Sequence, residues 1–142
     1  KEVLNTLLSL GRRHGQPVII HSRYAWKDSL ALAAESGVEA AVFHWFTGPA
    51  SVLQGIVEAG HYLSATIAAE YHAEHRRAVR EVPLDRLLLE TDCPVAYQGQ
   101  RSEPADVRRS LAAAAAIREV APDLVASRTT QNAIRLFHLP AV

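Results

Sequence analysis

The sequence contains few of the residues that mark special environments. Its 142 residues include one cysteine, Cys93, and no methionine, and only 6% are aromatic. A single cysteine excludes an internal disulfide and is typical of proteins of the reducing cytoplasm, which is the location we predict. Because the chain begins at Lys1 and has no methionine, we expect it to be part of a longer protein.

The sequence also lacks an excess of charge of either sign and a long hydrophobic segment. Fifteen basic side chains balance fifteen acidic ones, so no overall field attracts nucleic acid, and any phosphate must be bound at a local site. No apolar run approaches the roughly 18 to 20 residues of a membrane span, and no signal peptide is recognisable. With 49% hydrophobic residues, the chain is long enough to form one core over residues 1–142. We expect it to have no membrane partner.

The sequence does contain a regular alternation of helix and strand patterns. Short apolar runs predict four strands, at 17–21, 40–44, 61–66 and 86–92. Helical patterns lie before and between them and continue after the last, at 2–15, 28–37, 49–60, about 71–81 and 102–120, and residues 123–137 are expected to form one or two helices. Strands joined by helices run parallel and are buried on both faces, which explains continuous runs such as "VII" and "LLL". This βα repeat predicts an α/β fold.

Two architectures fit such a repeat, an open doubly wound sheet and a (β/α)8 TIM barrel. No glycine-rich phosphate-binding turn follows any of the predicted strands, which favours the barrel. A barrel needs about 250 residues, so we expect this chain to supply about four βα units, or half a barrel. An open half would leave two unpaired strand edges and an apolar inner face, and we predict that a missing amino-terminal half covers them.

Three of the predicted strands end on a side chain that can bind a metal ion. "PVIIHSR" carries His21, "AAVFHWFTG" carries His44 and "RLLLETDCP" carries Asp92. In a barrel, chemistry is built at the carboxyl ends of the strands, so we expect these side chains to converge. Their nitrogen and oxygen donors suit zinc, manganese, iron or, more weakly, magnesium. A polar residue at a strand end is ordinary where it stands alone, but three at equivalent depth favour a metal site.

Five segments resemble, in order and spacing, the carboxyl-terminal half of the TatD-type metal-dependent deoxyribonucleases. They are "PVIIHSR", "HWFTG", "LLLETDCP", "SEP" at 102–104 and "TTQNAIRLF" at 129–137. The resemblance implies a metallo-hydrolase barrel that hydrolyses DNA or a small phosphodiester with metal-activated water. It implies two divalent ions per complete site, Mg, Mn or Zn. His21 and His44 would bind one of them, and Asp92 would bind the other or position the attacking water.

The sequence departs from this family in one respect. The H-x-H pair of the family's first strand and the bridging glutamate of a middle strand have no counterpart here, so we expect the missing amino-terminal half to supply these ligands. Asp92 is the predicted catalytic residue. Arg23 is predicted to bind a substrate phosphate through its planar donor fork, with an ion pair to Glu90 or Asp92 as the alternative. His75, after the third strand, is predicted to line the substrate cleft.

Two other functions remain open. The first keeps the barrel and the metal but hydrolyses an amide or lactone, as in the amidohydrolase-like group. A carboxylated lysine at a strand end would favour it, and neither Lys1 nor Lys27, the only lysines, is so placed. The second is a non-catalytic half-barrel that binds a partner chain through its open face.

Overall fold

The structure, a computed structural model, describes residues 1–140, so the last two positions of the predicted 1–142 domain lie outside the described residues. The helices are α1 (Glu2–His14), α2 (Trp26–Ser36), α3 (Ala50–Glu58), α4 (Ala73–Glu81), α5 (Val107–Arg118) and α6 (Pro122–Phe137). The strands are β1 (Val18–His21), β2 (Ala41–His44), β3 (Tyr62–Ala65), β4 (Leu87–Leu89), β5 (Ala96–Tyr97) and β6 (Gln100–Arg101). Three short 3-10 turns, η1 (Ile67–Glu70), η2 (Leu84–Arg86) and η3 (Pro104–Asp106), lie beside them.

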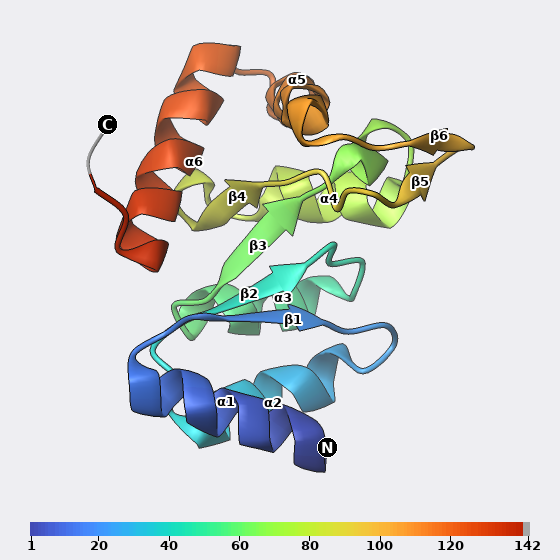
Figure 1. Cartoon of the computed structure of the whole chain (residues 1–142). Helices are drawn as coiled ribbons and strands as arrows, with labels where there is room; N and C mark the ends of the chain where they lie inside the picture. The colour runs from blue at the N-terminus through green and yellow to red at the C-terminus, as the bar shows by residue number, and fades with distance from the viewer. Residues whose placement is uncertain (141–142) are drawn as a thin grey trace.

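The first four strands form one parallel sheet in the order β1-β2-β3-β4, with helices between successive strands (Figure 1). Each strand pairs with the next one in the sequence, which confirms the predicted parallel βα repeat. In this register His21 is opposite His44, and His44 is opposite Ser64. The carboxyl ends of neighbouring strands are therefore level with one another along one edge of the sheet.

The two faces of the sheet have different surroundings. On one face Ile20, Phe43 and Leu63 join the larger hydrophobic core, to which α1 to α4 contribute. On the other face Ile19 and Val42 line a cavity of about 500 Å³, together with residues of β4, α5 and α6. Ile19 is 63% exposed whereas its neighbour Ile20 is 3% exposed, so only one face of the first strand is covered.

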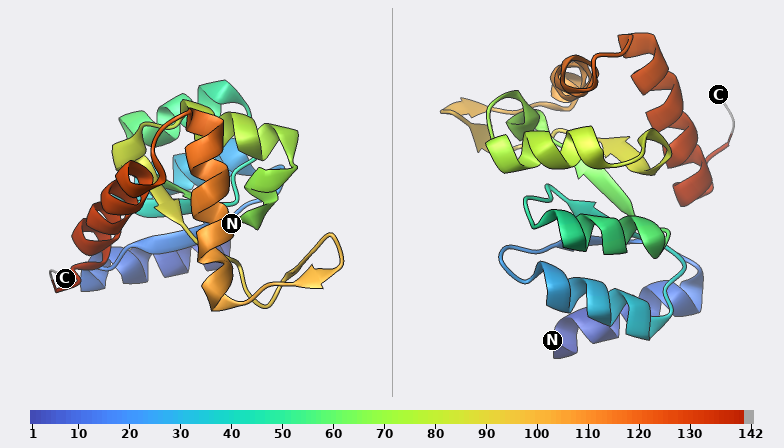
Figure 2. Two further views of the ribbon diagram at one scale, coloured as in Figure 1. Left: turned by 90° about the horizontal axis from the view of Figure 1, so that it is seen from above. Right: turned by 180° about the vertical axis from the view of Figure 1, so that it is seen from behind.

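The helices follow the predicted pattern closely. Helices α1 and α2 are followed directly by the capping residues Gly15 and Gly37, whose φ values of 62° and 65° are in the left-handed region that glycine adopts without a steric penalty. The pattern at 123–137 is a single helix, α6. The hairpin formed by β5 and β6, which was not predicted, projects from the body of the molecule (Figure 2). Among the described residues, no helix has the length and apolar character needed to span a bilayer.

Candidate metal centre

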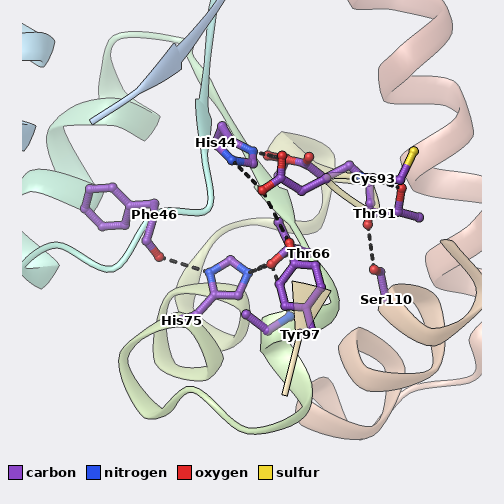
Figure 3. Close-up of polar contacts among 12 residues, drawn as sticks. His44, Phe46, Thr66, His75, Thr91, Cys93, Tyr97 and Ser110 are labelled. Atoms are coloured by element: carbon purple, nitrogen blue, oxygen red, sulfur yellow. Dashed lines mark hydrogen bonds and ion pairs between the residues drawn. The ribbon is translucent and has the colours of Figure 1, made fainter. Parts of the chain in front are cut away.

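A group of potential metal ligands lies at the carboxyl edge of the parallel sheet (Figure 3). His44 is the last residue of β2, Glu90 follows β4 directly, and Asp92 lies two residues further on. One ligand atom from each of these three side chains lies within 4.8 Å of the other two. The sheet register thus brings together residues that are 46 and 48 positions apart in the sequence.

The orientation of the His44 ring is fixed by Glu90. The Nδ1 atom of His44 is 2.6 Å from Glu90 Oε1, and because an ionised carboxylate only accepts hydrogen bonds, Nδ1 carries the proton. Ser64 Oγ donates to the same glutamate oxygen. A carboxylate that accepts from one ring nitrogen fixes the tautomer and directs the other nitrogen toward a metal. The Nε2 lone pair of His44 is therefore the one available for a ligand.

This lone pair faces the carboxylate of Asp92. His44 Nε2 and Asp92 Oδ2 are 3.4 Å apart, and with the proton on Nδ1 both atoms are electron-rich. A shared cation, either a second proton on the ring or a metal ion, would stabilise two such atoms at this separation. One imidazole nitrogen and one carboxylate oxygen are a donor pair that suits Zn²⁺ or Mn²⁺. The residues present thus fit a divalent ion.

The electrostatics of the site favour a positive charge at this point. Burial lowers the pKa of His44, but the hydrogen bond and charge of Glu90 and the charge of Asp92 outweigh it, so the pKa is raised above its usual value. Burial on its own would raise the pKa of Glu90. The hydrogen bonds from His44 and Ser64 outweigh this effect of burial, so the pKa of Glu90 is lowered. The site therefore consists of an ionised glutamate and a histidine that readily becomes cationic.

His21 lies next to this group without belonging to it. Its ring centroid is 5.4 Å from that of His44, and its side chain is exposed at the end of β1. The strand register accounts for this neighbourhood, since His21 and His44 are paired positions. His21 therefore borders the group formed by His44, Glu90 and Asp92.

Arg23 is also on the exposed side of the site. Its guanidinium carbon lies 5.5 Å from the centroid of the Tyr24 ring, and within the part of the chain that the structure describes no ion pair joins it to Glu90 or Asp92. Arg23 lines a cavity of about 580 Å³ whose wall includes Trp26 and His21. The structure therefore does not contain the alternative, an ion pair between Arg23 and Glu90 or Asp92.

His75 lies in the core and not on the cleft surface expected for it. Its side chain is 0% exposed, with Nδ1 3.0 Å from the carbonyl oxygen of Phe46 and Nε2 accepting from the backbone N–H of Thr66 at 3.2 Å. Burial lowers its pKa to about 4. Both ring nitrogens are used to connect the segments that follow β2 and β3, so His75 supports these segments and does not face a substrate.

From the sequence, Glu90 is predicted only as a possible ion-pair partner of Arg23. A signal was nevertheless present, because Glu90 is two residues after Leu88 and alternate residues of a strand share a face. Leu88, Glu90 and Ser64 line the same cavity. A carboxylate on that face, level with the end of β2, was in position to reach a histidine.

Comparisons with known proteins give one consistent family. The protein family described as "TatD related DNase" matches residues 1–138 of this chain. The chain is 39% identical over 142 residues to the Escherichia coli K12 "Uncharacterized metal-dependent hydrolase YcfH", covering 94% of this chain and 54% of the relative. It is 32% identical over 139 residues to the human "Deoxyribonuclease TATDN3", covering 96% of this chain and 51% of that protein.

A solved structure agrees with the sequence comparisons. The crystal structure of YJJV, a TatD homologue from Escherichia coli K12, superposes with a TM-score of 0.85 at 28% identity, covering 94% of this chain and 54% of the YJJV chain. The described chain therefore has the α/β fold found in that structure. It spans about half the length of the curated relatives that it matches.

Proposed function

Since this chain belongs to the TatD related DNase family, we propose that it is part of a metal-dependent hydrolase that cleaves DNA phosphodiester bonds. The observation that carries the proposal is the pair formed by His44 Nε2 and Asp92 Oδ2 at 3.4 Å, two electron-rich atoms that a shared metal ion would stabilise. The name of the human relative, a deoxyribonuclease, supports the choice of bond.

The proposal assigns a role to each of these side chains. His44 and Asp92 are metal ligands, and His21, whose exposed ring is next to that of His44, is a further ligand. Asp92 also orients the attacking water as the catalytic residue. A bound divalent ion would lower the pKa of a water molecule to about 7, which makes it a nucleophile at neutral pH. Arg23, exposed beside the site, binds a phosphate oxygen of the substrate. Glu90 holds the His44 ring in the orientation that presents Nε2.

The proposal extends to the architecture of the whole protein. The four parallel strands would be about half of a (β/α)8 barrel, with residues 1–142 as its carboxyl-terminal half. A segment outside these 142 residues would supply the remaining strands and metal ligands. The uncovered face around Ile19 and the coverage of about half of each relative support this arrangement. The single cysteine supports a location in the reducing cytoplasm.

The test uses the gene product that contains these residues, purified with and without Mn²⁺ or Zn²⁺. We expect metal-dependent hydrolysis of end-labelled DNA and of bis(p-nitrophenyl) phosphate, and its loss after chelation. Hydrolysis of amide or lactone substrates without phosphodiester cleavage would favour the amidohydrolase-like alternative. A stable protein that takes up no metal and cleaves none of these substrates would replace the enzymatic proposal with the non-catalytic half-barrel.

A further inference from the structure

We propose that Tyr97 is a positioning residue that holds the Asp92 carboxylate in place to receive the metal ion. This inference rests on the proposed function, because the orientation of Asp92 matters for hydrolysis only if its carboxylate is a metal ligand. Tyr97 lies outside the segments that carry the family resemblance, on the hairpin formed by β5 and β6.

The hairpin is built to direct Tyr97 inward. In the segment "AYQGQR", Gln98 and Gly99 form the two-residue turn with φ values of 50° and 84°, the backbone pattern of the tight turns that suit the twist of a hairpin. Successive side chains of a strand point to opposite sides. Accordingly Ala96 is exposed, whereas Tyr97 is 3% exposed.

The Tyr97 ring is held by hydrophobic contacts from two other segments. Its centroid is 5.4 Å from that of Trp45, in the segment after β2, and it packs in one cluster with Ile67 and Ala68 of η1. A ring fixed on these sides leaves its hydroxyl little freedom of position. The hydroxyl therefore acts as a fixed donor at the edge of the metal centre (Figure 3).

The hydroxyl of Tyr97 reaches the carboxylate oxygen that faces His44. It donates to Asp92 Oδ2 at 3.4 Å, and the same oxygen is 3.4 Å from His44 Nε2. Asp92 has a backbone φ of 53°, a conformation that aspartate tolerates in loops. Among the residues described, His44 and Tyr97 are the side chains in polar contact with this carboxylate. The hydrogen bond from Tyr97 to Asp92 would thus persist when His44 Nε2 binds a metal.

The chemistry of the pair gives the hydrogen bond of Tyr97 its direction. An ionised carboxylate only accepts hydrogen bonds. The Tyr97 hydroxyl is therefore the donor and Asp92 Oδ2 the acceptor.

The first measurement is the metal affinity of Tyr97→Phe, by calorimetric titration of the gene product with Mn²⁺ and Zn²⁺. The variant keeps the ring and removes only the donor, and we expect its affinity to fall about 10- to 100-fold, as for other groups that orient a metal ligand. Tyr62→Phe is the matched control. Tyr62 is also 3% exposed, at the opposite end of the sheet, and its hydroxyl accepts from Arg86 and Arg135. The affinity of Tyr62→Phe should equal that of the parent.

The second measurement separates this inference from the proposed function. In crystal structures of the metal-free proteins, we expect Asp92 to face His44 in the parent and to turn away in Tyr97→Phe. An Asp92 that keeps its place in the variant overturns the positioning role, whatever the affinities are. If neither protein binds Mn²⁺ or Zn²⁺, the proposed function fails, and the position of Asp92 in the two metal-free structures still decides the role of Tyr97.

Discussion

The role proposed for Asp92 concerns activity more than stability. Its side chain is about 29% exposed and its partners are two polar groups, so it contributes little to the core. We expect Asp92→Asn to abolish phosphodiester hydrolysis while the free energy of unfolding stays within about 1–2 kcal/mol of the parent. Turnover assays and urea titrations measure the two quantities. Asp85→Asn, at the exposed opposite end of the sheet, is the control, and parental turnover by Asp92→Asn would remove this carboxylate from the mechanism.

The two histidines at the strand ends should differ in their effect on metal binding. His44 has its ring oriented by Glu90, whereas His21 is exposed. We therefore expect His44→Ala to lower the affinity for Mn²⁺ or Zn²⁺ more than His21→Ala does, and both to lower it relative to His14→Ala, an exposed control in α1. Equilibrium dialysis with metal analysis provides the measurement. Parental metal content in both strand-end variants would end their assignment as ligands.

Individual site residues were predictable to different degrees. His44 and Asp92 could be found from the sequence because they end or closely follow apolar runs, and the ends of parallel strands meet at one edge. The role of Glu90 depends on the rotamer that brings its oxygen to His44 Nδ1. That of Tyr97 depends on the turn that directs it inward. Neither the rotamer nor the turn is encoded in hydrophobic periodicity, so neither role was predicted.

At the scale of the element, α1 approaches β1 closely at Gly11. A Cβ at this position would lie 2.5 Å from Val18 Cγ2 and 2.9 Å from the carbonyl oxygen of Gln16. Alanine is the better helix former by about 1 kcal/mol, but the backbone oxygen cannot move without shifting the following turn. We expect Gly11→Ala to lower the free energy of unfolding by about 1–3 kcal/mol, as overpacking does.

Chemical denaturation of Gly11→Ala and of a second α1 variant would test this contact. Ser9→Ala is the matched change, because Ser9 is exposed on the same helix and its substitution should alter the free energy of unfolding by no more than about 0.5 kcal/mol. A more stable Gly11→Ala would mean that helix propensity outweighs the contact with Val18 and Gln16.

Whole elements were more predictable than their details. The four strands were predicted at 17–21, 40–44, 61–66 and 86–92, and each observed strand of the parallel sheet lies within its predicted range. Continuous apolar runs and helical periodicity are strong over such lengths. The β5–β6 hairpin was missed because its strands have two residues each, too few for any periodicity to be recognised.

At the scale of the molecule, the sheet has one covered and one open face. The sequence predicts that all its strands are buried on both sides, yet Ile19 is 63% exposed and lines the open cavity with Val42 and Leu88. A pattern of apolar residues indicates which side chains need to be covered. It does not say which part of a protein covers them.

His75 links the stability of the whole molecule to pH. It is buried at the junction of α4 with the segments after β2 and β3, where its nitrogens contact Phe46 and Thr66. Burial lowers its folded-state pKa to about 4, below the value of about 6.5 for an unfolded chain. Protonation therefore favours the unfolded state. The stabilisation linked to the neutral ring is present above about pH 6.5 and is lost as the pH falls toward 4.

Between about pH 7 and pH 5 this linkage should remove about 2 kcal/mol from the free energy of unfolding, because the unfolded histidine takes up a proton that the folded one excludes. Urea titrations of the metal-free protein across this range measure the loss. His75→Gln, which cannot titrate, should be less stable at neutral pH but show a shallower pH dependence. His72→Gln is the control, since its side chain is 37% exposed and the parental slope should persist. An unchanged slope in His75→Gln would show that another group is responsible for the acid sensitivity.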